Sequence, residues 1–142
     1  MNIDSIQNGV VLDHIQAGKS MDIYNYLHLD ELDCSVAIIK NVRSNRMGKK
    51  DIIKLDSPVD VDVDVLGYID DQITVNIIRD GEQVEKRRLE PPKKLVNIIR
   101  CKNPRCITSS EPQLDAVFLL SDPEQHIYRC AYCDTANVKK NF

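Results

Sequence analysis

The N-terminal two thirds of the chain alternate between short apolar runs and polar stretches rich in turn-forming residues. Runs of this length that contain β-branched residues are typical of β-strands. The pattern predicts strands at residues 9–15, 35–42, 51–56 and 72–78, then a turn at 79–82 and a fifth short strand. A helix is predicted at residues 20–29, with Ser20 as its N-cap and Met21, Tyr24 and Leu27 on one face. This order of elements indicates an α+β fold, with an antiparallel sheet covered on one face by one or two helices.

Two of these segments have further features. The run at residues 35–42 is apolar enough for a buried strand, and the strand at 51–56 places Ile53 and Leu55 on one face. Residues 59–65 alternate strictly between valine and aspartate, which by pattern alone predicts a half-buried strand. A helix there would oppose the local propensity of the β-branched residues.

A change in composition marks a boundary at residues 90–94, where Pro91 and Pro92 interrupt both helix and central strand. We therefore expect two domains, at residues 1–92 and 93–142. The second is small enough that it needs a bound metal to fold well.

Bulk composition narrows the function classes. Hydrophobic residues make up 42% of the 142 residues, so the chain can build a core. A formal net charge of −3, with only five tyrosines and two phenylalanines, argues against nucleic acid as a partner. No apolar run approaches the roughly 18 residues that cross a bilayer, and the N-terminus lacks a signal-peptide pattern. We therefore expect a cytoplasmic protein without a membrane partner.

Four cysteines form two close pairs, Cys101-x4-Cys106 and Cys130-x2-Cys133. Two such knuckles can converge on one ion, and four thiolates suit a tetrahedral zinc site with no open position for water. The flanking basic residues, which can offset the charge of that centre, are Arg100, Lys102, Arg105 and Arg129. The pattern predicts structural zinc; two disulfides and an iron–sulfur cluster are the alternatives. Cys34 stands alone before an apolar strand and is interpreted as a small buried hydrophobe.

Polar residues within the predicted strands are the other candidates for chemistry. Asp13 and His14 lie inside an apolar strand, where a strand end or an edge position also explains them. Lys50, Ile52 and Lys54 share a strand face, where two ammonium groups can hold a phosphate or simply face solvent. The chain has no P-loop, no Ser-His-Asp set and no metal site with an open position, so a catalytic role is disfavoured.

Taken in order, several segments resemble the regulatory chain of aspartate carbamoyltransferase. They are GVVLDHI at residues 9–15, MGKKDIIK at 47–54, TVN at 74–76 and the cysteine module with its Glu111-Pro112 step. The resemblance covers nearly the whole chain. It implies a non-catalytic subunit of pyrimidine synthesis, whose N-terminal domain is a ferredoxin-like α/β sandwich that binds ATP, CTP and in some members UTP. It also implies a small C-terminal all-β zinc domain that holds the catalytic chain, and homodimers of regulatory chains that link catalytic trimers.

The resemblance also implies a helix within residues 59–71 and a set of pocket residues. Asp13 would accept from a base amino group, His14 would meet a phosphate oxygen, and the lysines would meet ribose and triphosphate oxygens. The apolar members would enclose the base. The full set is Ile3, Asp4, Ile6, Val11, Asp13, His14, Lys50, Lys54, Asn76, Ile78 and Lys86.

Two departures from the family pattern affect this transfer. Gly81 stands where some members have an aromatic residue near the ribose, so that contact is missing or supplied differently. Only Met1 and Asn2 precede Ile3, whereas a longer basic tail helps some members bind a second nucleotide, which puts synergy between effectors in question. The alternative function is a zinc-ribbon nucleic-acid-binding protein that uses the basic stretch at residues 79–105, and the acidity and low aromatic content of the chain disfavour it.

Overall fold

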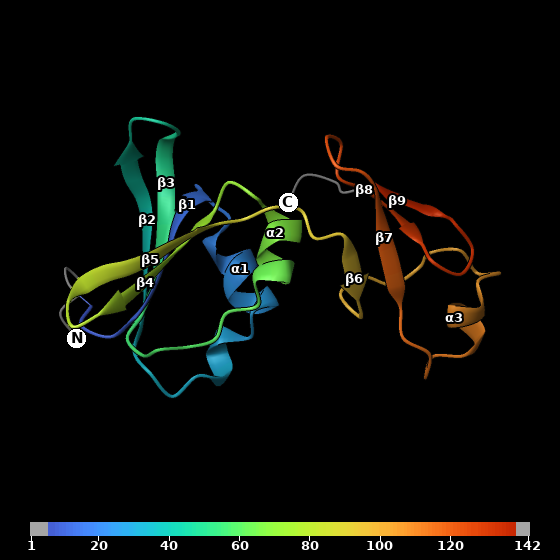
Figure 1. Ribbon diagram of the computed structural model, residues 1–142, viewed down its shortest axis with the longest axis horizontal. Helices are drawn as coiled ribbons and strands as arrows, with labels where there is room; N and C mark the ends of the chain where they lie inside the picture. The colour runs from blue at the N-terminus through green and yellow to red at the C-terminus, as the bar shows by residue number, and fades with distance from the viewer. Residues whose placement is uncertain (1–5, 139–142) are drawn as a thin grey trace. The chain divides into compact units, whose positions relative to one another are not determined.

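The computed structural model describes residues 6–138 (Figure 1). Ile3 and Asp4, two of the expected pocket residues, lie outside that range. Contacts within the chain divide it between Glu90 and Pro91 into two compact units. None of the helices described is long and apolar enough to cross a bilayer.

The N-terminal unit is a five-stranded sheet in the order β2-β3-β1-β4-β5, and all neighbouring strands are antiparallel. Helices α1 and α2 lie together on one side of this sheet (Figure 1). The chain order βαββαβ, with β1 and β3 in the centre, is ferredoxin-like, and β5 extends the sheet by one strand. The elements are β1 Gly9–Gln16, α1 Ser20–Tyr26, a 3₁₀ turn η1 Leu29–Glu31, β2 Val36–Ser44, β3 Gly48–Leu55, α2 Val63–Ile69, β4 Thr74–Arg79 and β5 Glu82–Arg88. The expected fold is confirmed.

Strand alternation gives the sheet two different faces. Leu12 pairs with Ile53 on one side and Val75 on the other, and all three are at most 1% exposed. This face forms the core with the helices, through residues such as Leu66. Because side chains alternate along a strand, the neighbours of these residues point to the opposite face. That open face is available for a ligand.

Helix α1 differs from the expectation in its buried side. Its N-cap is Lys19, which makes no capping hydrogen bond through its side chain, and Ser20 is instead the first helical residue and fully buried. Met21 is 48% exposed, while Ile23 packs into the core. The predicted N-cap and the predicted apolar face are therefore wrong. Apolar residues occur on more than one side of α1, and the side that packs against the sheet is the one with Ser20 and Ile23.

The segment at 59–71 has the helix that the resemblance implies and lacks the strand that the alternation predicts. Residues 59–62 belong to no helix or strand. Asp62 then caps α2, because its Oδ1 accepts from the N–H groups of Asp64 at 3.1 Å and Val65 at 3.2 Å. The strand prediction for residues 59–65 is therefore wrong: the chain turns helical at Val63, and the helix buries the continuous run from Leu66 to Ile69.

Two irregularities in the sheet flank the start of β3. The β1 register shifts between Leu12 and Ile15, and His14 has φ 59° there. The β2 register shifts between Ile39 and Val42, and Asn41 has φ 61° there. Both are β-bulges, which re-aim nearby side chains and strengthen the local twist.

The carboxylate of Asp51, on the helix-covered side of β3, binds the bulge in β2 and the turn that follows β1. It is fully buried and accepts from the N–H of Gly18 at 3.0 Å and from the N–H of Asn41 at 3.0 Å. Burial alone would raise the pKa of Asp51, but the hydrogen bonds from Asn41, Ser20 and Gly18 lower it below the ordinary value of 3.8. Asp51 is therefore ionised at neutral pH.

The C-terminal unit is a four-stranded antiparallel sheet in the order β6-β7-β8-β9. Its core contains Leu95, Phe118 and Tyr128, and the Tyr128 hydroxyl donates to the Pro92 carbonyl at 2.7 Å. The elements are β6 Lys94–Val96, α3 Ile107–Ser110, β7 Val117–Asp122, β8 Ile127–Cys130 and β9 Ala136–Val138. The unit is all-β except for the single helical turn of α3.

Replacement of the buried carboxylate tests the role of Asp51. Asp51→Asn keeps the shape but removes one acceptor, so the free energy of unfolding should fall by about 1–3 kcal/mol at pH 7, and amide hydrogen exchange at Gly18 and Asn41 should accelerate. The stabilisation is present above the unfolded pKa and is lost as pH falls through the lowered folded pKa, so the two proteins should converge in strong acid. Asp56→Asn, at an exposed site one residue past β3, is the control. Unchanged exchange at Gly18 and Asn41 would contradict this role.

Candidate metal centre and ligand pocket

The four predicted cysteines converge at one point of the C-terminal unit. Their sulfur atoms all lie within 4.8 Å of one another, with Cys101 and Cys133 separated by 3.6 Å and Cys106 and Cys130 by 3.7 Å. A tetrahedral site with ~2.3 Å metal–sulfur bonds has edges of about 3.8 Å. A disulfide needs sulfurs about 2.05 Å apart, so the predicted alternative of two disulfides does not fit this arrangement.

Tight turns bring each pair of sulfurs together. In the first knuckle the Cys106 N–H donates to the Asn103 carbonyl at 3.0 Å. In the second the Asp134 N–H donates to the Cys130 carbonyl at 2.9 Å, and Asp134 has φ 64°. Cys106 and Cys130 are buried, and four sulfur ligands leave no position for water. The site is therefore that of a structural metal.

Two threonine hydroxyls that the sequence analysis did not predict contact the metal-ligating sulfurs. The Thr108 hydroxyl lies 3.1 Å from Cys106 Sγ and lowers the pKa of that thiol. The Thr135 hydroxyl lies 3.1 Å from Cys133 Sγ and lowers the pKa of Cys133 to about 6. Once the sulfur is a thiolate, a hydroxyl at this distance can donate to it and stabilise the form that a metal requires. The signal was present in the sequence, because each knuckle contains a Cys-x-Thr step.

Burial has the opposite effect on the remaining two ligands. It raises the pKa of Cys101 to about 12 and also raises the pKa of Cys130. Each knuckle therefore contributes one thiol favoured as thiolate and one that needs the metal charge to ionise.

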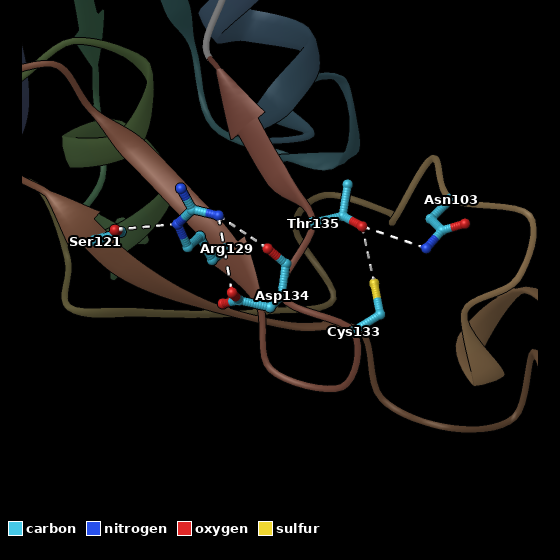
Figure 2. Close-up of polar contacts among 6 residues, drawn as sticks. All are labelled: Asn103, Ser121, Arg129, Cys133, Asp134 and Thr135. Atoms are coloured by element: carbon cyan, nitrogen blue, oxygen red, sulfur yellow. Dashed lines mark hydrogen bonds and ion pairs between the residues drawn. The ribbon is translucent and has the colours of Figure 1, made fainter.

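Figure 2 shows how the second knuckle is held. Asn103 Nδ2 donates to the Thr135 hydroxyl at 3.3 Å, which links the two knuckles. Arg129 donates from Nε to Ser121 Oγ at 3.3 Å and from Nη1 to the Asp134 carbonyl at 3.1 Å. Of the basic residues expected around the metal, Arg129 thus has a defined structural role.

The open face of the N-terminal sheet carries a hollow of about 360 Å³. Six of the predicted pocket residues line it: Ile6, Val11, Asp13, Lys54, Asn76 and Ile78. Three lining residues, Ile52, Gly81 and Gln83, were outside the predicted set. Ile52 was recognisable from its place between two lysines on one strand face, whereas Gln83 depends on the register shift between Ile77 and Ile78.

The other predicted residues adjoin this hollow on the same sheet. Lys50 forms an ion pair with Asp13 at 2.9 Å, and the backbone N–H of His14 donates to Asp13 Oδ1 at 2.6 Å. Burial raises the pKa of Asp13, but Lys50 and His14 outweigh it and the pKa is lowered. His14 Nδ1 lies 3.0 Å from the Thr74 hydroxyl. Lys86 on β5 pairs with Asn76 on β4.

Asn76 is the residue of the hollow that most directly indicates a ligand. It is 9% exposed, and its Oδ1 is buried without a hydrogen-bond partner among residues 6–138. Buried acceptors are nearly always paired, because an unpaired one costs free energy. An N–H or O–H group of a bound molecule would satisfy it.

Gly81 and Gln7 shape the mouth of the hollow. Gly81 has φ 78°, and its N–H donates to the Gln7 carbonyl at 2.9 Å. A Cβ at position 81 would meet the Gln7 side-chain oxygen at 3.2 Å. The Gln7 side-chain amide therefore occupies the space beside Gly81 that a larger side chain would need.

Comparison with known proteins follows the same division of the chain. Residues 1–90 match the family model for the allosteric domain of the aspartate carbamoyltransferase regulatory chain, and residues 93–141 match that for its metal binding domain. The chain belongs to the aspartate carbamoyltransferase regulatory chain family. The regulatory chain of Clostridium tetani is 52% identical over 135 residues, which is 94% of each chain. That of Clostridium botulinum strain Hall is 50% identical over 134 residues, 94% of this chain and 92% of the relative.

A more distant regulatory chain, from Bifidobacterium longum, is 44% identical over 134 residues, 94% of this chain and 96% of the relative. Family membership makes the protein a regulatory, non-catalytic chain. In this chain the hollow lies in the part that matches the allosteric domain, and the four cysteines lie in the part that matches the metal binding domain. The alternative of a nucleic-acid-binding zinc ribbon is not favoured.

Loss of one metal ligand should affect the two units differently. Cys106→Ser should release the metal and remove hydrogen-exchange protection from β7 and β8, because the small core cannot hold the knuckles together alone. The sheet of residues 9–88 should keep its protection. Cys34→Ser, which changes a half-buried thiol in the N-terminal unit, should retain the metal. A Cys106→Ser protein that has lost its metal but keeps protected β8 amides would show that the site is not structural.

Proposed function

We propose that this chain is the nucleotide-sensing subunit of aspartate carbamoyltransferase, with ATP and CTP, and UTP alongside CTP, as its effectors. The hollow on the open sheet face would receive the nucleotide. The buried, unpaired Asn76 Oδ1 is the observation that carries this proposal, since it lies between apolar and cationic groups. An effector that binds two states of the assembled enzyme with different affinity would shift their balance.

The chemistry of the hollow fits a nucleotide from one end to the other. Ile6, Val11 and Ile78 offer an apolar enclosure for a base. The Asp13 carboxylate can accept from an amino group. Lys54 lines the hollow, while Lys50 and Lys86 face the same side of the sheet and can meet ribose and phosphate oxygens.

We further propose zinc as the metal, because a closed set of four thiolates suits it. Apolar side chains stand exposed beside the ligands: Ile107 is 51% exposed directly after Cys106, and Tyr132 is 46% exposed directly before Cys133. Exposed apolar residues at such positions suit a docking surface for the catalytic chain. Loss of zinc would then release the catalytic chain.

The sheet edge formed by β2 supports the proposal of a homodimer of regulatory chains. β2 is an outer strand of the sheet and pairs only with β3 among the described strands. The prediction of a buried strand there is only half met, because Val36, Ala37, Ile38 and Ile39 are all partly exposed. An apolar edge with unpaired backbone groups can pair with a second copy. We place the protein in the cytoplasm, where reduced thiols remain available for metal.

Nucleotide binding can be tested by calorimetry on the full chain. Lys50→Ala and Lys86→Ala should each weaken CTP and ATP binding about 10- to 100-fold, the effect of losing a charge-assisted contact of ~1.5–3 kcal/mol. Asn76→Leu should weaken it as well, because Oδ1 is lost. Lys49→Ala is the matched control, since the exposed Lys49 points to the opposite sheet face. Equal affinities in the Lys50 and Lys86 variants and wild type would refute the pocket assignment.

Assembly is tested by co-purification with the catalytic chain. The complex should form, and its aspartate carbamoyltransferase activity should respond to ATP or CTP. Removal of the metal should dissociate it, because the Ile107 and Tyr132 surface depends on the knuckles. A complex that survives complete metal removal with its nucleotide response intact would contradict the proposed docking surface.

A further inference from the structure

Arg46, which lies outside the expected pocket set, stands at the cationic end of the open sheet face. Because neighbouring strands are antiparallel, the end of β1 and the starts of β3 and β4 lie at the same edge of the sheet. Arg46 is in the turn between β2 and β3 at that edge. His14 and Lys50 lie there too, while Gly81 and Gln83, which also line the hollow, lie toward the other end.

A hydrogen bond fixes where the Arg46 side chain goes. Its Nη2 donates to Gln72 Oε1 at 2.8 Å. Gln72 lies two residues before the start of β4, and β1 lies between β3 and β4, so this bond spans the end of β1. His14 is the bulged residue at that end, and Thr74 beside it contacts its ring at 3.0 Å. The guanidinium is thus held over the His14 end of the sheet.

The acceptor of this bond is an uncharged amide, whose Nε2 donates in turn to Asp71 Oδ1 at 3.3 Å. Several cations act on one imidazole. Burial lowers the pKa of His14, Asp13 opposes this, and the charges of Lys50, Arg46 and Lys86 lower it further. These cations come from the β2–β3 turn, β3 and β5, so positive charge collects around the end of β1 from several elements.

We propose that Arg46 forms the distal end of a polyphosphate subsite and makes the pocket discriminate nucleoside triphosphates from monophosphates. This inference rests on the proposed nucleotide-binding function. Ile78, which lines the hollow, and Thr74, which contacts the His14 ring, are four residues apart on β4, about 13 Å along a strand at ~3.3 Å per residue. A base held in the hollow needs a phosphate chain to reach that far. A guanidinium presents five donors in a planar fork that matches phosphate oxygens.

The alternative is that Arg46 only fastens the hairpin to β4 through Gln72. The two roles differ in their dependence on phosphate number. A fastening role would weaken mono-, di- and triphosphates alike when the residue is replaced. A polyphosphate contact would weaken the triphosphate alone or most strongly.

Calorimetric titration of the metal-loaded full chain with CMP, CDP and CTP, at one fixed ionic strength, separates these roles. Arg46→Gln should weaken CTP about tenfold while CMP changes less than twofold, and Arg46→Lys should recover part of the preference because it keeps the charge. The matched control is Arg43→Gln. Arg43 is exposed on the same hairpin but pairs with Lys49, so it points to the opposite face and should leave the CTP to CMP ratio unchanged.

The outcomes distinguish this inference from the one beneath it. If Arg46→Gln binds CTP and CMP with the same ratio of affinities as the wild-type protein, the role of Arg46 is overturned and the nucleotide pocket is unaffected. A parallel loss for all three nucleotides assigns Arg46 to fastening and also overturns the proposal. A wild-type protein that binds none of them overturns the proposed function together with the subsite.

Discussion

The open face of the N-terminal sheet depends on one buried carboxylate on its other face. Asp51 accepts N–H groups from the β1–α1 turn and from the bulge in β2, so it ties both neighbours of β3 at the level of Lys50. The next residue back, Lys50, points the opposite way and pairs with Asp13. An ionised group in the core is costly unless it is fully hydrogen-bonded. Here that requirement fixes the turn at Gly18 and the bulge at Asn41 on either side of β3, next to the Lys50 that pairs with Asp13.

The C-terminal unit depends on its cysteine site because its apolar core is small. Its two knuckles are joined by few hydrogen bonds besides that of Asn103 to Thr135. Four sulfurs at the spacing of a tetrahedron can bind one metal ion, and that binding would hold the two knuckles together. The hydroxyls of Thr108 and Thr135 prepare one sulfur in each knuckle for a metal. Ile107 and Tyr132 follow and precede metal ligands directly, so the surface that they form would keep its shape only while the metal is bound.

The strands and the metal ligands could be predicted because each carries a local pattern. Alternation placed Ile53 and Leu55 on the buried face and Lys50 and Lys54 on the open one, as the structure has them. The side of α1 could not be predicted, since it depends on which helix face the sheet covers. The start of α2 at Val63 depends on an aspartate cap that alternation with valine obscured.

The remaining parts of the site were hidden for a physical reason. The burial of Asp51, the reach of Arg46 to Gln72 and the Gln7 amide over Gly81 all join residues far apart in the chain. Such contacts follow from strand order and register, and no local sequence pattern encodes them. The Cys-x-Thr steps are the exception, because the hydroxyl and the sulfur are only two residues apart.

The two edges of the N-terminal sheet differ in a way that limits how the sheet can grow. Strand β5 is exposed along its whole length and carries Glu82, Glu85, Lys86, Arg87 and Arg88. Charged side chains along an edge disfavour an incoming strand, whereas the opposite edge strand, β2, is apolar over residues 36–39 and carries Lys40 and Arg43 beyond them. Pairing of β2 with the β2 of a second copy would consume both apolar edges and leave charged edges outermost. Edge pairing would then stop at two copies, because no apolar edge would remain to add a third copy and extend the sheet into a fibre.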